Sequence, residues 1–227
     1  MKRALTTLAL LIAIAAPSAS QAMPMRPGPY FSGFLGVTVP RDTTNAATTD
    51  FSSGQTFNER IGFDPGVYIG GAGGFDFGFL RLEGEISYKE ADMKSITDNT
   101  GANQYHDIDG NLGALAFMAN AFFDIHNYSP VTPYFGGGIG FATLHMTDTF
   151  ATTASNQRQL MYPRDDSTVF AYQAGGGLDI ALTPRYSLDL GYRYFDTDWA
   201  SFSRHQLTTS RVRFESHNAM VGFRMKF

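Results

Sequence analysis

Cysteine is absent from this chain of 227 residues. The absence excludes disulfides and thiolate metal sites, and the spacings of histidine and aspartate match no familiar metal site either. An excess of basic residues is absent too, because 17 Lys and Arg residues are set against 21 Asp and Glu residues, a net charge of −4. That balance argues against a nucleic-acid partner. We therefore expect no metal, no cofactor and no nucleic acid.

Long apolar runs are scarce as well, since the one clear run covers residues 4–16. It follows Lys2 and Arg3, and small residues follow it. This three-part layout is typical of a secretory signal peptide, and the run is too short to span a bilayer comfortably. We predict a signal peptide over residues 1–22, cleaved between Ala22 and Met23, and no membrane-spanning helix in the rest of the chain.

Alternation of apolar and polar residues is abundant. In the segment 80–88, Leu82 and Ile86 fall on one face, while Arg81 and Glu85 fall on the other, because successive side chains of a strand point to opposite faces. Eight segments share this pattern: 31–39, 67–75, 80–88, 115–123, 135–143, 170–180, 186–194 and 219–227.

The length of these segments and the spacing between them favour a membrane barrel. A tilted strand needs about 9–11 residues to cross a bilayer, and bacterial single-chain barrels have an even number of strands. Short connections (76–78, 124–133, 181–185) alternate with long ones (40–66, 89–114, 144–169, 195–218). The sequence therefore predicts an all-β fold, an eight-stranded antiparallel transmembrane up-and-down β-barrel. It forms one domain over residues 23–227, with four long extracellular loops.

If the apolar faces meet lipid, the opposite faces line the lumen. We predict that they form a polar network of nine residues: Arg81, Glu83, Glu85, Gln173, Asp179, Asp189, Arg193, Arg224 and Lys226. An eight-stranded barrel is only just wide enough to be filled by side chains, and an unpaired buried charge is costly. We expect the charges to pair and to close the lumen; a gated conduit for small ions is the alternative.

Four segments carry a resemblance to a known family: TPYFGGGIGFA at 132–142, YQAGGGL at 172–178, LTPRYSLDLGYRYF at 182–195 and VGFRMKF at 221–227. With them the chain resembles the outer-membrane protein A-like β-barrels of Gram-negative bacteria, especially the opacity-type surface antigens. The resemblance implies export to the cell outer membrane and insertion by the outer-membrane assembly machinery. It also implies that Phe223, Met225 and the terminal Phe227 belong to the signal that this machinery reads.

The resemblance further implies a structural or surface-interaction role, in envelope integrity, as a surface antigen or as an adhesin. The expected partners are outer-membrane lipids, lipopolysaccharide and a host or surface ligand at the loops. We expect no enzymatic activity and no catalytic residues. One alternative is a narrow porin for small solutes. Another is a lipid A-modifying enzyme, for which Ser216 and His217 near the outer rim are the candidate pair.

Overall fold

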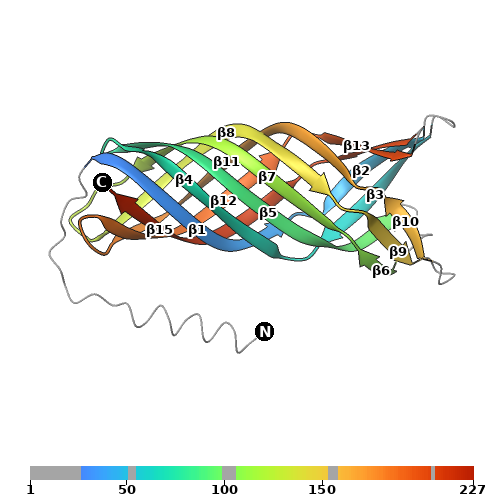
Figure 1. Cartoon of the computed structure of the whole chain (residues 1–227), viewed down its shortest axis with the longest axis horizontal. Helices are drawn as coiled ribbons and strands as arrows, with labels where there is room; N and C mark the ends of the chain where they lie inside the picture. Colours follow the sequence, from blue (N-terminus) through green and yellow to red (C-terminus); the bar gives the residue numbers. More distant parts are fainter. Residues whose placement is uncertain (1–26, 51–54, 99–105, 153–157, 206–207) are drawn as a thin grey trace, which may run out of the picture.

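The computed structural model of the chain describes residues 27–50, 55–98, 106–152, 158–205 and 208–227 (Figure 1). Within these ranges the chain forms fifteen β-strands. No helix in the described part is both long enough and apolar enough to cross a membrane. The predicted signal peptide, residues 1–22, and the cleavage position between Ala22 and Met23 lie outside the described residues.

Eight strands close into one antiparallel barrel, as the alternating pattern predicts. They are β1 (Gly28–Pro40), β4 (Gly66–Asp76), β5 (Leu80–Asp98), β7 (Asn111–Asp124), β8 (Val131–Met146), β11 (Asp165–Ala181), β12 (Tyr186–Thr197) and β15 (Glu215–Lys226). Each pairs with the next, and β15 returns to β1, where Leu35 lies opposite Val221. Closure removes free strand edges, so the backbone is stabilised without disulfides. The predicted fold class is confirmed.

The barrel strands run past their apolar stripes at the end that carries the long connections. β5 continues to Asp98 and β8 to Met146, well beyond the predicted segments. The connections predicted as loops also contain strands, because paired strands satisfy their own backbone hydrogen bonds. These strands are β2 (Thr43–Asp50), β3 (Gln55–Phe63), β6 (His106–Asp109), β9 (Thr149–Thr152), β10 (Arg158–Tyr162), β13 (Ala200–His205) and β14 (Thr208–Val212).

These additional strands make two groups. β13, β14, β2 and β3 continue the barrel sheet from the edge of β5, whereas β6, β9 and β10 form a separate three-stranded sheet. Both groups project from the barrel at the end opposite the C-terminus (Figure 1). We refer to the two ends of the barrel as the short-turn end and the long-connection end.

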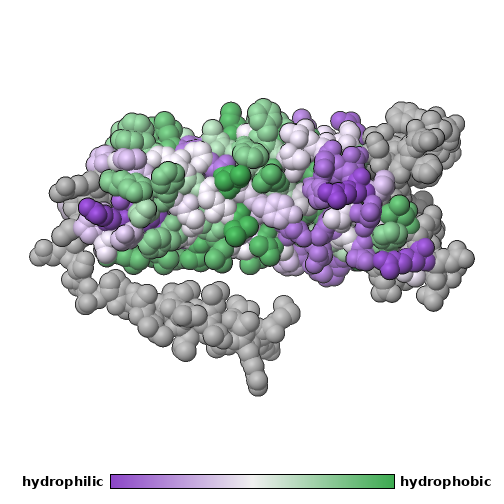
Figure 2. Space-filling model, in the orientation of Figure 1, coloured by the Kyte–Doolittle hydropathy of each residue, from purple (hydrophilic) through white to green (hydrophobic). Residues whose placement is uncertain are grey.

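The outward faces of the barrel strands form an apolar wall. Phe31 is 64% exposed and Leu35 is 67% exposed, although both belong to regular, fully paired strands. Green apolar residues cover the barrel from the short-turn end past its middle, and purple polar residues gather toward the long-connection end (Figure 2). An exposed apolar surface of this kind marks contact with lipid or another apolar partner.

Aromatic rings gather at both ends of the apolar wall. Toward the short-turn end, four ring pairs have centroids between 4.7 and 5.9 Å apart: Phe31–Phe227, Phe75–Phe77, Phe123–Phe135 and Tyr186–Phe223. Toward the other end lie tyrosines, among them Tyr172 and Tyr194, whose ring centroids are 6.5 Å apart. Two aromatic belts are the arrangement expected at the two surfaces of a bilayer.

Candidate functional site

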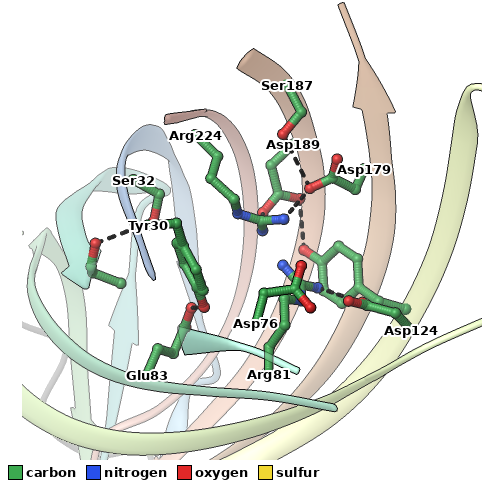
Figure 3. Close-up of polar contacts among 12 residues, drawn as sticks. Tyr30, Ser32, Asp76, Arg81, Glu83, Asp124, Asp179, Ser187, Asp189 and Arg224 are labelled. Atoms are coloured by element: carbon green, nitrogen blue, oxygen red, sulfur yellow. Dashed lines mark hydrogen bonds and ion pairs between the residues drawn. The ribbon is translucent and has the colours of Figure 1, made fainter. Parts of the chain in front are cut away.

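The lumen begins at the short-turn end with charges that pair. Arg224 forms ion pairs with Asp179 and with Asp189, the latter at 3.2 Å between Nη2 and Oδ2. Lys226 pairs with Asp76 across the closure of the barrel. Figure 3 shows Arg224 pointing between the two aspartates, which come from β11 and β12.

A fourth ion pair of this layer joins β5 to β7. The Nη2 atom of Arg81 lies 2.9 Å from Oδ1 of Asp124, and the Arg81 side chain is 1% exposed. Its guanidinium also lies over the ring of Tyr134, 4.5 Å from the centroid. The Tyr134 hydroxyl in turn donates to Asp189 at 2.6 Å. We call the residues of this layer the paired layer: Asp76, Arg81, Asp124, Asp179, Asp189, Arg224 and Lys226.

Above the paired layer, the carboxylates accept hydrogen bonds from neutral groups. Glu85 accepts from Asn120 at 2.8 Å and from Gln173 at 2.9 Å. Glu83 accepts from the Tyr30 hydroxyl at 2.6 Å, a contact drawn in Figure 3. These charges are therefore held by amides and hydroxyls, which stabilise a carboxylate without a cation.

The cations at the same height rest on aromatic rings. The Arg193 guanidinium lies 4.2 Å from the centroid of Phe122, and its Nε and Nη1 atoms have no hydrogen-bond partner among the described residues. The Lys89 ammonium lies 3.9 Å from the centroid of Phe195 and 3.1 Å from the Ser87 hydroxyl. Neither cation belongs to an ion pair in the described part of the chain. The expectation that the lumen charges pair therefore fails here, because aromatic faces take the place of carboxylates.

The lumen ends, toward the long connections, in apolar side chains. We call this cluster the apolar plug: Ile61, Phe63, Met93, Leu112, Ala114, Ala116, Met118, Ala142, Leu144, Met146, Ala171, Phe195, Ala200, Phe202, Val212 and Phe214. Leu112 and Leu144 are fully buried, and the rings of Phe195 and Phe214 meet edge to face with centroids 6.2 Å apart. β3, β13 and β14 contribute to it, so the projecting strands help to close the barrel.

The structure places the nine residues of the predicted network in the lumen, in three different settings. Arg81, Asp179, Asp189, Arg224 and Lys226 lie in the paired layer. Glu83, Glu85 and Gln173 form a hydrogen-bonded group with Asn120, in which the two carboxylates accept from the side-chain amides. Arg193 lies beside this group without a carboxylate partner.

Sequence reasoning missed several lumen residues. Asp76 and Asp124 stand at the ends of strands beside short turns, where they read as turn residues. The plug was missed because Ala114, Ala116 and Met118 alternate with equally apolar outward residues on β7. The sequence of β7 is apolar on both faces, and this pattern could have predicted apolar side chains inside the barrel.

The three residues predicted as an assembly signal lie at the short-turn end, on the outward side. Phe223 stacks on Tyr186 with centroids 5.5 Å apart, and Phe227 meets the edge of Phe31 at 5.9 Å. Met225 lies between them in sequence and opposite Phe31 in register.

Ser216 and His217, the candidate pair of a lipid A-modifying enzyme, do not contact each other. Ser216 is fully buried and contacts Asn218, whereas His217 points outward and lies 2.6 Å from the Tyr192 hydroxyl. Adjacent residues of a strand face opposite sides of the wall, so this serine and this histidine cannot form a catalytic pair.

Beyond the tyrosine belt, a compact polar cluster covers the outward side of β12 and β15. The Arg213 Nε atom donates to Asp196 at 2.7 Å, and Arg41 pairs with Glu215 at 2.7 Å. Burial alone would raise the pKa of Asp196, but hydrogen bonds from Arg213 and Tyr172 and the charge of Arg213 outweigh it, so the pKa is below its ordinary value. The cluster keeps a buried carboxylate charged at the rim.

A hollow of about 750 Å³ opens at the same end on the opposite side of the rim. Its lining includes Asp92, Lys94, Asn111, Asp148 and Arg164, which come from the connections 89–114 and 144–169. Polar groups thus converge at the end of the barrel that carries the projecting strands.

Comparison with known proteins identifies this architecture. Residues 6–226 match the family model described as outer membrane protein beta-barrel domain. The chain is 23% identical over 219 residues to outer membrane protein PagN of Salmonella typhimurium, covering 88% of this chain and 90% of that protein. Proteins of Brucella abortus, Brucella suis and Brucella melitensis are 36% identical over 95 residues, which is 40% of this chain and 33% of each of theirs.

Solved structures agree on the fold. The Pseudomonas aeruginosa outer membrane protein OprG is 18% identical, with a TM-score of 0.56, covering 88% of this chain and 96% of that one. Neisserial surface protein A is 20% identical, with a TM-score of 0.50, covering 88% of this chain and 97% of that one. The family match spans nearly the whole chain, so this protein belongs to the outer membrane protein beta-barrel domain family and is a β-barrel of the Gram-negative outer membrane.

Proposed function

We propose that this protein is a closed barrel without enzymatic activity that presents its extracellular rim and projecting strands to partners outside the cell. One observation carries the proposal: a paired layer of charges and an apolar plug fill the same lumen. Unpaired ions cross apolar, water-free regions at great cost, so the filled lumen supports a surface role over a channel. Short turns lead toward the periplasm and the long-connection end faces outward, as in related barrels.

Planar-bilayer recording of the purified protein tests the closed lumen. We expect no stable conductance steps. Stable steps in the wild-type protein that disappear in Arg193→Ala would contradict the proposal in favour of a small-solute channel. Disappearance of the steps would also show that the current passes through this lumen and not through a leak around it.

The surface role needs a separate test, because a closed barrel can also act only in envelope integrity. In β2 and β3, Ala46 lies opposite Glu59, so replacing residues 47–58 with an Asn-Gly turn shortens this hairpin while keeping its base. We expect bacteria that display the shortened protein to bind host cells or host-surface glycans more weakly than those with the full chain. A shortened β13–β14 hairpin is the matched variant, and heat-modifiable gel mobility checks that each barrel is folded.

Equal binding by both variants and the full chain would favour an envelope-integrity role over adhesion. A lipid A modifying activity would appear as a changed acyl content in lipid A mass spectra upon expression. We expect none, since the Ser216 hydroxyl and the His217 ring face opposite sides of the wall.

We also propose that Phe223, Met225 and Phe227 are read during assembly by the outer-membrane insertion machinery. Their outward position at the end of the final strand supports this role. Replacement of Phe227 by Ser should reduce the insertion of the protein in cells, while refolding of the purified chain in detergent should be nearly unchanged. Equal losses in both assays would assign Phe227 a purely structural role.

A further inference from the structure

The hollow of about 750 Å³ at the long-connection end has the size of a small-molecule site, for which volumes of about 300–1,000 Å³ are typical. Most such sites are lined predominantly by apolar side chains. Here nine of the twelve lining residues are charged or polar, and Met93 and Ile108 are the apolar side chains. The hollow therefore suits a ligand that forms many hydrogen bonds.

Hydrogen bonds tie the first three long connections together around the hollow. The backbone N–H of Asp64, in the first connection, donates to the carbonyl of Asp92, in the second, at 3.0 Å. The backbone N–H of Asn111, in the second connection, donates to the hydroxyl of Thr147, in the third, at 2.9 Å. A wall that is tied together before binding loses less conformational entropy when a ligand binds.

Two carboxylates of the lining keep oxygens available as acceptors. The Asp92 carboxylate has no hydrogen-bond or ion-pair partner within the described part of the chain. Asp148 accepts the backbone N–H of Arg164 at 2.7 Å through Oδ1, which leaves Oδ2. A carboxylate has about four lone-pair sites, so most of the acceptor capacity of both groups remains for a ligand.

Two cations of the lining keep donors available as well. The Lys94 ammonium lies 3.3 Å from Oδ1 of Asp64, a contact that uses one of its three N–H groups. The Arg164 guanidinium, with five N–H groups, has no partner among the residues that the structure describes. A hydroxyl both donates and accepts, so a polyhydroxylated ligand can use the acceptors and the donors of this hollow together.

The balance of charge selects among such ligands. Four aspartates line the hollow, against the two cations Lys94 and Arg164, and His145 lies against a further carboxylate, that of Asp166. Like charges that are brought together disfavour a partner, so sulfated and carboxylated sugars are excluded. A polycation is the alternative ligand, but Lys94 already pairs with Asp64, and Arg158 pairs with Asp109 at 2.8 Å.

We propose that this hollow binds a neutral oligosaccharide, one without sulfate, phosphate or carboxylate groups, outside the cell. Asp92 and Asp148 accept hydrogen bonds from its hydroxyls, and Lys94 and Arg164 donate to its oxygens. Ile108 offers an apolar contact to the C–H face of a sugar ring. The inference rests on the proposed surface role and adds to it a site and a class of ligand.

An array of host glycans that pairs each neutral oligosaccharide with its sialylated and its sulfated form tests the assignment. Labelled protein is applied in phosphatidylcholine nanodiscs, so that no lipopolysaccharide competes. We expect binding to a subset of the neutral oligosaccharides and weaker binding to their acidic forms. Asp92→Ala and Arg164→Ala should each lower the affinity at least tenfold, which corresponds to about 1.4 kcal/mol, because each removes hydrogen bonds to a charged group.

Arg41→Ala is the matched control. Arg41 is an exposed arginine at the same end of the barrel, outside the lining of the hollow. This variant should bind neutral oligosaccharides as the wild type does. Asp92 and Arg164 are exposed as well, so neither replacement removes a core contact, and heat-modifiable gel mobility shows that each variant is folded.

Three results would overturn the assignment. They are preferential binding of the sialylated or sulfated forms, binding that Asp92→Ala and Arg164→Ala leave unchanged, and binding of oligolysine on the same array without binding of any oligosaccharide. An array without any binding would also overturn it. If shortening the β2–β3 hairpin still weakened host-cell binding in that case, the surface role would stand without the saccharide site; if it did not, both proposals would fail.

Discussion

Near the short-turn end, the inward side chains of β5, β12 and β15 are charged, whereas toward the long-connection end the barrel is filled by alanine, methionine and phenylalanine. Both fillings occupy a cylinder of the same eight strands. In the paired layer, each cation pairs with a carboxylate of an adjacent strand or of the strand after it, as Arg224 of β15 does with Asp189 of β12 and Asp179 of β11. In the apolar plug, contacts are short and non-directional.

The paired layer and the apolar plug differ in what they require to be stable. Paired charges link adjacent or next-but-one strands at defined heights, but they require every partner, since one missing charge leaves another buried and unpaired. The plug tolerates imperfect geometry because apolar contacts add up over many atoms. Between the two, Glu85 and Lys89 occupy the same region without forming an ion pair.

The largest effect is expected where one substitution leaves two charges unpaired. Arg224→Met removes the partner of both Asp179 and Asp189, which are nearly fully buried. We expect the free energy of unfolding to fall by about 3–5 kcal/mol. Urea titration of the protein in lipid vesicles, followed by the fluorescence of the single tryptophan, Trp199, measures the change.

The matched control neutralises the same site as a whole. The triple variant Arg224→Met, Asp179→Asn, Asp189→Asn removes all three charges, so it should recover most of the loss. A triple variant as unstable as the single one would show that the packing of the arginine, and not its charge, stabilises the paired layer.

A somewhat smaller loss is expected in the apolar plug. Leu144→Ala leaves a cavity at a fully buried position, and substitutions of this kind cost about 2–5 kcal/mol. The salt dependence of unfolding would distinguish the paired layer from the apolar plug only weakly, because both are buried. The comparison therefore relies on second substitutions at neighbouring residues. No second substitution of a neighbouring residue by Ala should rescue Leu144→Ala, in contrast to the triple variant of the paired layer.

The two buried lysines sharpen the comparison. Lys89→Met replaces a cation that rests on Phe195 and has no carboxylate partner, so we expect the stability to stay unchanged or to rise by about 1–2 kcal/mol. Lys226→Met is the matched variant, and it should destabilise because it leaves Asp76 unpaired. Equal losses for both lysines would mean that the rings stabilise Lys89 as well as a carboxylate stabilises Lys226.

The outward half of this architecture could be predicted from the sequence. The alternation of residues 80–88 predicts which side chains face the lipid, because Leu82 and Ile86 must share one face of a strand, whatever the neighbouring strands are. The alternation of short and long connections predicts that the long connections gather at one end of the barrel and the short turns at the other. The strands within the long connections were not predicted, since segments such as 43–50 carry no apolar alternation; this one is held by pairing with the following strand β3 and with the distant β14.

The partners inside the lumen could not be predicted in the same way. Which side chains meet depends on the relative heights of strands, and these follow from the register around the whole barrel. Glu85 and Arg193 have opposite charges and both point inward, yet they do not form an ion pair. Glu85 accepts hydrogen bonds from Asn120 and Gln173 instead. The sequence names the inward residues but not the contacts among them.

The smallest effect is expected at the outer rim, where charges are paired but close to water. Asp196 has a lowered pKa in the folded protein, so it contributes stability that is complete above the unfolded pKa of about 3.9 and is lost as the pH falls below it. Arg213→Gln removes the charge and the hydrogen bonds of Arg213, which lower this pKa together with the hydrogen bond from Tyr172. We expect a loss of about 1 kcal/mol at pH 7 that shrinks toward zero as the pH is lowered through 4.

Arg41→Gln is the control for this prediction, because Arg41 is largely exposed and solvent screens its pair with Glu215, so its removal should change the stability little. Urea titrations between pH 3.5 and 7 would compare the two variants. A pH-independent loss for Arg213→Gln would show that its packing over Asp196 matters more than its charge. The rim would then resemble the apolar plug, and paired charge would stabilise this barrel only at the short-turn end of its lumen.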